Sequence, residues 1–526
     1  MLSALARRLE ARGVYGAERK LKRALRNILV TTVILIALAI ITGYYVLLIM
    51  VLISAMLFLV GIFSSGRNYD LINREAILFA VHGFILANAG FDVTAIFDRL
   101  AKMKEYEGSY VFRKIMGYFY FTGLDIKEAI SRTLQEEKKL GMSFKSLLTG
   151  VYGGLVTGTD SQTIFNRIIQ QEIIGSERDI EKFDSLVSSF LSGLMPVVIM
   201  LPLLTVLLGG LAGMGPAESL FLNIGLGIMI ALILLFSENR FLYYPENIML
   251  SLKTLAMQLT VSIAVAVSLY YVIGTRSLLF AVLSFFLVGY YSERKYIRVR
   301  RDIYSYLPTF LADLSGRISM GHTFTEAVTS MPLDIYGEFS GVLKYSIGNL
   351  INVGVVPKRK DYDGIFAYRM YKNLLHDLMR GVYGSEALMN IRTVVSLMSS
   401  IYDKVRSTMT IYSILLAASL SLGMLFVDFL SFLGAKMSGS IAQVSEIPSS
   451  GLSGLMTLLS LLNVKGWIFD VYIVFAVAII FAFGIFISSV TDGTRHGNSL
   501  SILFAVIAIS ILLGIHEFVS PAILRF

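Results

Sequence analysis

The chain has no cysteine among its 526 residues, which excludes disulfide bonds and thiolate metal sites. It also lacks a Gly-x4-Gly-Lys-Ser/Thr phosphate loop, so we do not expect it to hydrolyse nucleotide by itself. Five histidines are scattered without a recognisable metal-ligand spacing: His82, His322, His376, His496 and His516. His82 lies among apolar residues and is expected to be a core histidine. We therefore expect no catalytic residue, no cofactor and no metal, and not an enzyme.

Charge is scarce as well. Only 16% of the residues are charged, whereas soluble domains average about 25%. Hydrophobic residues make up 55% of the chain and the mean hydropathy is +0.70. The net charge of +9 lies beside apolar segments and lacks interleaved aromatic residues, which argues against nucleic-acid binding. Because little in the sequence alternates between polar and apolar residues, we predict an all-α polytopic membrane protein.

An internal repeat organises the sequence. The tetrapeptide Gly150-Val151-Tyr152-Gly153 returns as Gly381-Val382-Tyr383-Gly384, an offset of 231 residues. The same offset relates three further glycine pairs: Gly43 and Gly274, Gly90 and Gly321, and Gly123 and Gly354. A chance tetrapeptide match would not bring these glycines along, so the chain is predicted to be a tandem duplication. The glycines are expected to serve structure, in turns and close helix contacts.

The apolar segments predict about nine transmembrane helices. Residues 28–63 carry no charge, and a single helix of that length would be about 54 Å long, against a hydrocarbon core of about 30 Å; we expect a hairpin. The other spans are a pair in 183–236, a hairpin in 254–291, one helix in 408–433 and two in 467–526. Between them lie a basic amphipathic segment at 1–27, helical domains at 64–182 and 292–407, a link at 237–253 and a loop at 434–466.

Basic residues set the expected orientation. Of the 46 Lys and Arg residues, 42 fall in 1–27, in the two polar domains, in the link or in 491–497. Short loops rich in Lys and Arg stay on the cytoplasmic side. We therefore expect a multi-pass protein of the cell membrane with a cytoplasmic N-terminus and two cytoplasmic helical bundles, and with 434–466 outside. The segment 1–27 is expected to lie on anionic lipid or to dock to a cytoplasmic partner.

The layout resembles a known family. In each polar domain a helix ends at Ala89-Gly90 or at Met320-Gly321 and another follows, and each domain is flanked by membrane spans. This duplicated arrangement resembles the type II secretion system F family, most closely its archaeal branch of archaellum (assembly protein J) and type IV pilus platforms, with tight-adherence proteins as relatives. The resemblance implies a platform that couples a cytoplasmic hexameric secretion ATPase to insertion of pilin-like or archaellin-like subunits into a filament. Membrane lipid and a second copy of the chain are further expected partners.

One region departs from the repeat. Residues 355–364 have the composition of a basic loop, whereas the first copy continues into a helix after Gly123. Charged residues in both domains are candidate ATPase contacts: Lys102, Lys104, Lys138, Lys139, Lys358, Arg359 and Lys360. The alternative for such clusters is a solvated face or lipid headgroup contact, which we favour for Arg298–Arg301 beside a span. The rival function is a secondary transporter or channel with a direct repeat, because Pro196 and Pro202 interrupt an apolar segment.

Overall fold

The computed structural model describes residues 69–211, 251–356, 365–379, 385–442 and 467–515, with a few single positions between them. The described segments are helical and contain no β-strand, which confirms the all-α expectation. Four stretches are long and apolar enough to cross a membrane: Ser161–Met200, Lys253–Ser319, Leu388–Phe429 and Tyr472–Asp492. The expectations for 1–68, for most of 212–250 and for the 434–466 loop beyond residue 442 concern residues outside the described ones.

The first helical bundle is built from six short helices and the start of a long one. These are α4 (Tyr69–Arg74), α5 (Ala76–Asn88), α6 (Val93–Lys102), α7 (Ser109–Thr122), α8 (Ile126–Glu136), α9 (Met142–Thr157) and the long α10 (Ser161–Leu211). Phe79 is central to its core, with its ring 4.9 Å from that of Phe112 and 5.7 Å from that of Phe144. We call this the first bundle.

The second bundle uses the end of one long helix and the start of another. Its elements are the C-terminal half of α13 (Ser277–Ser319), α14 (Phe324–Thr329), η2 (Leu333–Tyr336), α15 (Phe339–Val353), α16 (Phe366–Leu378) and the start of α17 (Ser385–Ala442). Phe310 is fully buried here, and its ring lies 5.9 Å from that of Tyr336 and 6.3 Å from that of Tyr371.

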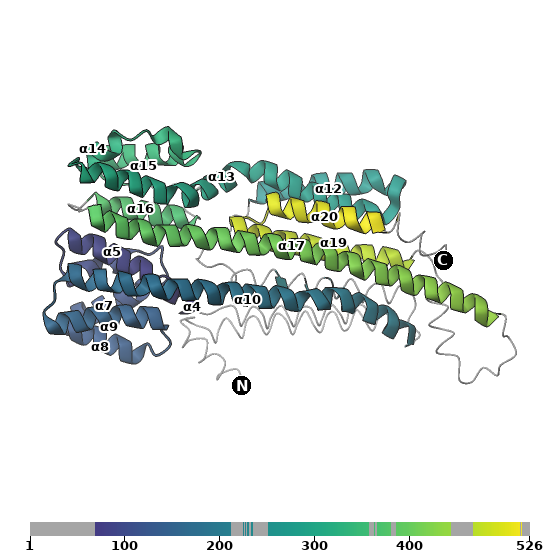
Figure 1. Cartoon of the computed structure of the whole chain (residues 1–526), viewed down its shortest axis with the longest axis horizontal. Coiled ribbons are helices and arrows are strands. Elements are labelled where there is room, and N and C mark those ends of the chain that lie inside the picture. The colour runs from purple at the N-terminus through teal and green to yellow at the C-terminus, as the bar shows by residue number, and fades with distance from the viewer. Residues whose placement is uncertain are drawn as a thin grey trace.

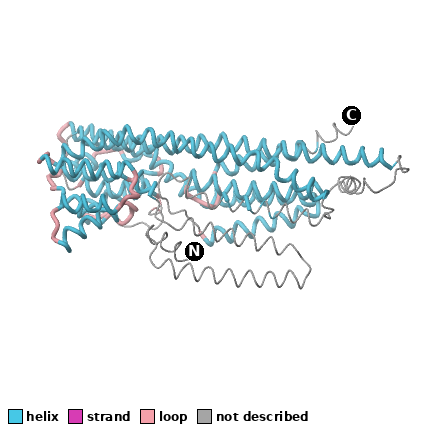
Figure 2. The backbone as a smooth tube through the Cα atoms, turned by 90° about the horizontal axis from the view of Figure 1, so that it is seen from below, coloured by secondary structure: helices cyan, strands magenta, loops and turns pink. Residues whose placement is uncertain are grey.

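Both bundles lie at one end of an elongated molecule, and apolar helices fill the other end (Figures 1 and 2). The apolar end contains α12 (Leu252–Ile273), the first half of α13, α19 (Trp467–Asp492), α20 (Ser499–Gly514) and the second halves of α10 and α17. α12 and α13 form a hairpin around a short 3-10 turn that begins at Gly274, the turn position expected from the sequence.

The long helices cross the expected domain boundaries. The sequence placed boundaries near residues 183, 292 and 408, but α10, α13 and α17 pass through these positions without a break. α10 also continues through Pro196 and Pro202, and α17 extends into the expected external loop as far as Ala442. At about 1.5 Å per residue, α10 is about 77 Å long and α17 about 87 Å, far more than a hydrocarbon core requires. Each bundle is thus joined to the apolar end by continuous helix.

Glycine and N-cap residues set the turns at the far end of each bundle. Gly90 and Gly321 follow the ends of α5 and α13 with φ of 84° and 91°, a region that glycine adopts without the steric cost met by other residues. Asp92 then caps α6 by accepting a hydrogen bond from the Ala95 amide at 3.1 Å. Thr323 caps α14 in a reciprocal box with Glu326. The two turns therefore have the same construction.

Candidate functional site

The two bundles meet at a buried polar junction. α5 of the first bundle packs against α16 of the second. From α5 comes His82, from the last turn of α6 comes Arg99, and from the last turn of α16 come His376 and Asp377. We call these four residues the junction. Because they come from both bundles, the junction holds the bundles together by charge as well as by packing.

Asp377 is its centre, and its side chain is fully buried. The carboxylate accepts hydrogen bonds from His82 Nδ1 at 2.9 Å and from Arg99 Nε and a terminal nitrogen at 3.1 and 3.0 Å. A carboxylate only accepts, so the His82 proton resides on Nδ1, and Nε2 faces the Tyr106 hydroxyl at 3.5 Å. The same Arg99 group lies 3.2 Å from His376 Nδ1.

Electrostatics keep this carboxylate ionised. Burial acts to raise the pKa of Asp377, but the adjoining His376 and His82 side chains and the Arg99 charge hold that pKa well below its usual range. A buried charge with complete partners is stable, whereas one that loses a partner is strongly destabilising. The junction therefore stabilises the contact between the bundles only while all its partners are present.

A second set of polar contacts extends the junction toward the apolar end. Arg369 donates to the Glu105 carbonyl at 3.2 Å, and Lys372 lies 3.9 Å from the Glu105 carboxylate. Glu75, fully buried just before α5, accepts hydrogen bonds from the amides of Gly108 at 2.7 Å and of the preceding residue at 3.2 Å. Burial raises the pKa of Glu75 to about 8, against the opposing effect of those amides. This carboxyl group therefore titrates near neutral pH.

Another buried polar cluster fixes the turn between α19 and α20. Arg300 of α13 is 4% exposed; it donates to the Thr491 carbonyl and lies 3.8 Å from the Asp492 carboxylate. Asp492 also accepts from the Tyr402 hydroxyl at 2.9 Å and from Asn498 at 2.5 Å. The expectation that Arg298–Arg301 faces lipid or solvent is therefore wrong for Arg300, because its position on α13 turns it into this cluster.

The same turn is held by the α12–α13 hairpin. Gln258 of α12 donates to the His496 carbonyl at 2.6 Å and to the Phe285 carbonyl at 2.9 Å. His496 Nδ1 lies 2.7 Å from the Gln258 side-chain oxygen. Gly289 leaves the space for this contact, since a Cβ there would lie 1.6 Å from the His496 carbonyl oxygen. The final helical hairpin is thus locked to the middle of the chain.

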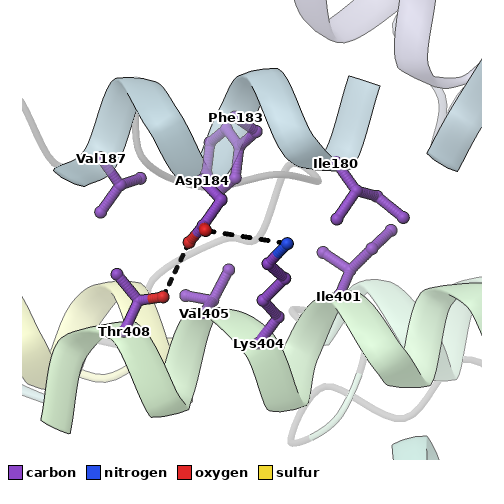
Figure 3. A pocket seen from close by; sticks show the side chains of 8 residues that line it. All are labelled: Ile180, Phe183, Asp184, Val187, Ile401, Lys404, Val405 and Thr408. Atoms are coloured by element: carbon purple, nitrogen blue, oxygen red, sulfur yellow. Dashed lines mark hydrogen bonds and ion pairs between the residues drawn. The ribbon is translucent and has the colours of Figure 1, made fainter. Parts of the chain in front are cut away.

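α10 and α17 form a parallel seam between the halves (Figure 3). Asp184 accepts from the Thr408 hydroxyl at 2.7 Å and lies 3.7 Å from Lys404. Near the bundles, Asn390 donates to Asn166 at 3.3 Å. Asp184 with Thr408 and Asn166 with Asn390 are both 224 residues apart in the sequence, so the helices run side by side in one direction over about 27 Å.

The candidate ATPase contacts do not gather in one place. Lys102 is exposed at the end of α6 and pairs with Asp98. Lys104 is exposed in the next connection, and Lys138 and Lys139 are exposed between α8 and α9. Lys358, Arg359 and Lys360 lie outside the described residues. The structure therefore places the four described lysines on two connections of the first bundle.

The repeated glycines occupy turns or helix contacts where they are described. Gly123 and Gly354 have positive φ at the ends of α7 and α15, as Gly90 and Gly321 have after α5 and α13. A Cβ on Gly150 would lie 3.1 Å from Ile168 of α10, whereas Gly153 has nothing within 4 Å. Gly381 and Gly384 lie outside the described residues.

Sequence reasoning missed the junction residues Arg99, His376 and Asp377. Buried charge on α16 has no distinctive pattern in a single sequence. One signal was available: His82 is a polar residue within an apolar helix, and the position 231 residues later is Asp313. Asp313 also makes a hydrogen bond, at 2.5 Å from the Tyr336 hydroxyl. A polar residue at the same place in both copies marks a tertiary contact.

Chemically, the site suits coupling of motions better than catalysis. The junction is closed and made of charges that satisfy each other. In the described part of the chain, no group of three or more His, Asp or Glu residues could hold a metal ion. Comparison with family models, with curated proteins and with solved structures finds no match.

Proposed function

We propose that the protein is the membrane platform of a filament-assembly machine of the archaellum or archaeal type IV pilus kind. In this role the two bundles receive a movement from a cytoplasmic hexameric ATPase, and the membrane helices pass it to pilin-like or archaellin-like subunits. The observation that carries the proposal is the continuity of α10, α13 and α17 from the bundles into the apolar end. A helix without a break transmits displacement or rotation over its whole length.

The helix boundaries support the duplication that this role assumes. An offset of 231 residues relates the ends of α5 and α13 (Asn88 and Ser319) and the starts of α6 and α14 (Val93 and Phe324). It also relates the ends of α7 and α15 (Thr122 and Val353) and of α10 and α17 (Leu211 and Ala442). The proposal therefore includes two repeated bundles, about nine spans, and a cell-membrane location with bundles and N-terminus cytoplasmic.

Co-purification tests the function directly. The tagged chain, extracted with mild detergent from its own cells, should bring down a hexameric ATPase. Reversing Lys358, Arg359 and Lys360 to glutamate should weaken that binding and stop filament assembly without loss of membrane insertion. Lys344→Glu, on exposed α15, is the control and should leave both unchanged. Normal filaments in the triple variant would remove this loop from the contact, and absence of any ATPase would count against the platform itself.

A second arm separates the platform from the transporter. Purified protein in sealed vesicles should move no solute without the ATPase. The chain has no cysteine, so Asn166→Cys with Asn390→Cys can form a disulfide across the seam. We expect the oxidised variant to bind ATPase but to assemble no filaments, with recovery after reduction. Solute flux from the chain alone would establish the transporter.

A further inference from the structure

The connection between α8 and α9 lies at the end of the first bundle that faces the apolar helices. The Phe144 amide donates to Asn73 Oδ1 at 3.2 Å, and the Arg74 guanidinium lies 4.9 Å from the Phe183 ring of α10. α10 turns apolar two residues later, at Ser185. This connection is therefore close to the level at which α10 leaves the polar region.

The packing of α9 on α10 gives the distance. The glycine contacts join Gly150 to Ile168 and Gly154 to Ile164, so the helices are antiparallel. Extending that register places Met142 opposite residue 176 of α10, and Lys138 opposite residue 180. These levels are about 14 Å and about 8 Å from Ser185 at ~1.5 Å per residue. Lipid headgroups extend about 5–8 Å beyond the hydrocarbon core.

The exposed charge of the connection is positive. Lys138 and Lys139 are exposed. The two preceding carboxylates, Glu136 and Glu137, are engaged by Lys114 at 3.0 and 2.8 Å. Next to the lysines, the Met142 side chain is 88% exposed, an arrangement that suits the boundary between headgroup and acyl chain. A surface that offers lysines and an apolar side chain together matches an anionic lipid better than it matches solvent.

A groove continues from this surface. It has a volume of about 570 Å³, and its lining is Leu140, Met142, Lys145, Ser146, Thr149, Gly150 and Gln171. Its polar groups include an ammonium, two hydroxyls and an amide, all of which donate hydrogen bonds to phosphate oxygens. Lys145 also donates to the Lys138 carbonyl at 3.0 Å, which ties the groove to the connection.

We infer that Lys138, Lys139, Met142 and the adjoining groove bind an anionic lipid headgroup. Lys138 and Lys139 contact the phosphate, Lys145 and its neighbours extend into the groove, and Met142 lies toward the acyl chains. A cytoplasmic ATPase that approaches from the far end of the bundle would not reach this surface first. The inference needs no assumption about the filament or the ATPase, and it assigns two of the candidate ATPase lysines to the membrane.

Hydrogen exchange on the full chain tests it. The protein is placed in nanodiscs of phosphatidylcholine alone or with phosphatidylglycerol, and exchange is followed in peptides covering 138–149. Phosphatidylglycerol should slow exchange there by about five-fold or more, since one basic residue near an anionic surface strengthens binding by roughly that factor. The protection should fall with added salt. Peptides around Gly123 at the far end should exchange equally in both lipids.

Variants separate charge from fold. Lys138→Glu with Lys139→Glu should abolish the difference between lipids, and Lys138→Arg with Lys139→Arg should keep it. Equal exchange of 138–149 in both lipids for the unmodified protein overturns the inference. So does lipid protection that survives charge reversal. Loss of ATPase co-purification in the reversed variant, without any lipid effect in the original, would show that these lysines bind protein instead.

Discussion

The junction gives the sharpest test of the structure. Replacing Asp377 with alanine removes a fully buried carboxylate that accepts three hydrogen bonds, from His82 and Arg99, at 2.9 to 3.1 Å. The change leaves His82 buried and Arg99 part-buried without their acceptor. Breaking a buried ion pair in this way costs about 3–5 kcal/mol. We expect a loss of that size in the free energy of unfolding.

The control is Asp98→Ala, which removes an exposed ion pair with Lys102 on the same bundle. Such a pair contributes about 0–1 kcal/mol. Denaturant unfolding in detergent micelles measures both variants, and spin labels on exposed positions of the two bundles report whether they separate. A loss for Asp377→Ala no larger than that of the control, with unchanged label distance, would refute the view that this carboxylate joins the bundles.

Three further predictions concern buried groups and glycines. Because the folded pKa of Glu75 is raised to about 8, its neutral form favours folding; stability should fall by up to roughly 1.4 kcal/mol per pH unit as pH rises from about 4.5 through 8, and Glu75→Gln should flatten this slope in unfolding curves. Gly289→Ala should destabilise by about 1–3 kcal/mol or more through its contact with the turn before α20, whereas Gly316→Ala in the same helix has open space and should be neutral or slightly stabilising by thermal melting. Gly90→Ala should cost about 1–2 kcal/mol because its φ is 84°, while Gly117→Ala in open α7 should not; equal effects would contradict the backbone argument.

Features that depend on local composition could be predicted from the sequence. Helix content, the membrane class and the turn at Gly274 follow from apolar segments and from glycine chemistry. Gly90, Gly123, Gly321 and Gly354 all have positive φ, as expected for residues that follow a helix end. These properties depend on a few neighbouring residues, so a single sequence contains them.

Features that depend on distant partners could not be predicted. Nothing near Asp377 in the sequence indicates that its partners are His82 and Arg99, nearly 300 residues earlier. Arg300 was assigned to lipid or solvent because it follows an apolar segment, and only the packing of α19 and α20 shows it buried. Helix continuity was also missed. Polarity changes along α10 while its backbone does not, so a change of environment was mistaken for a change of structure.

The locked turn before α20 has a consequence for biosynthesis. Gln258 and Arg300 emerge from the ribosome nearly 200 residues or more before the carbonyls of His496 and Thr491 that they bind. Until then these donors sit at the apolar end of an unfinished protein without those acceptors. Quality-control proteases should therefore recognise any product that stops before residue 490, even though both bundles are complete. The last helical hairpin decides whether the newly made chain survives.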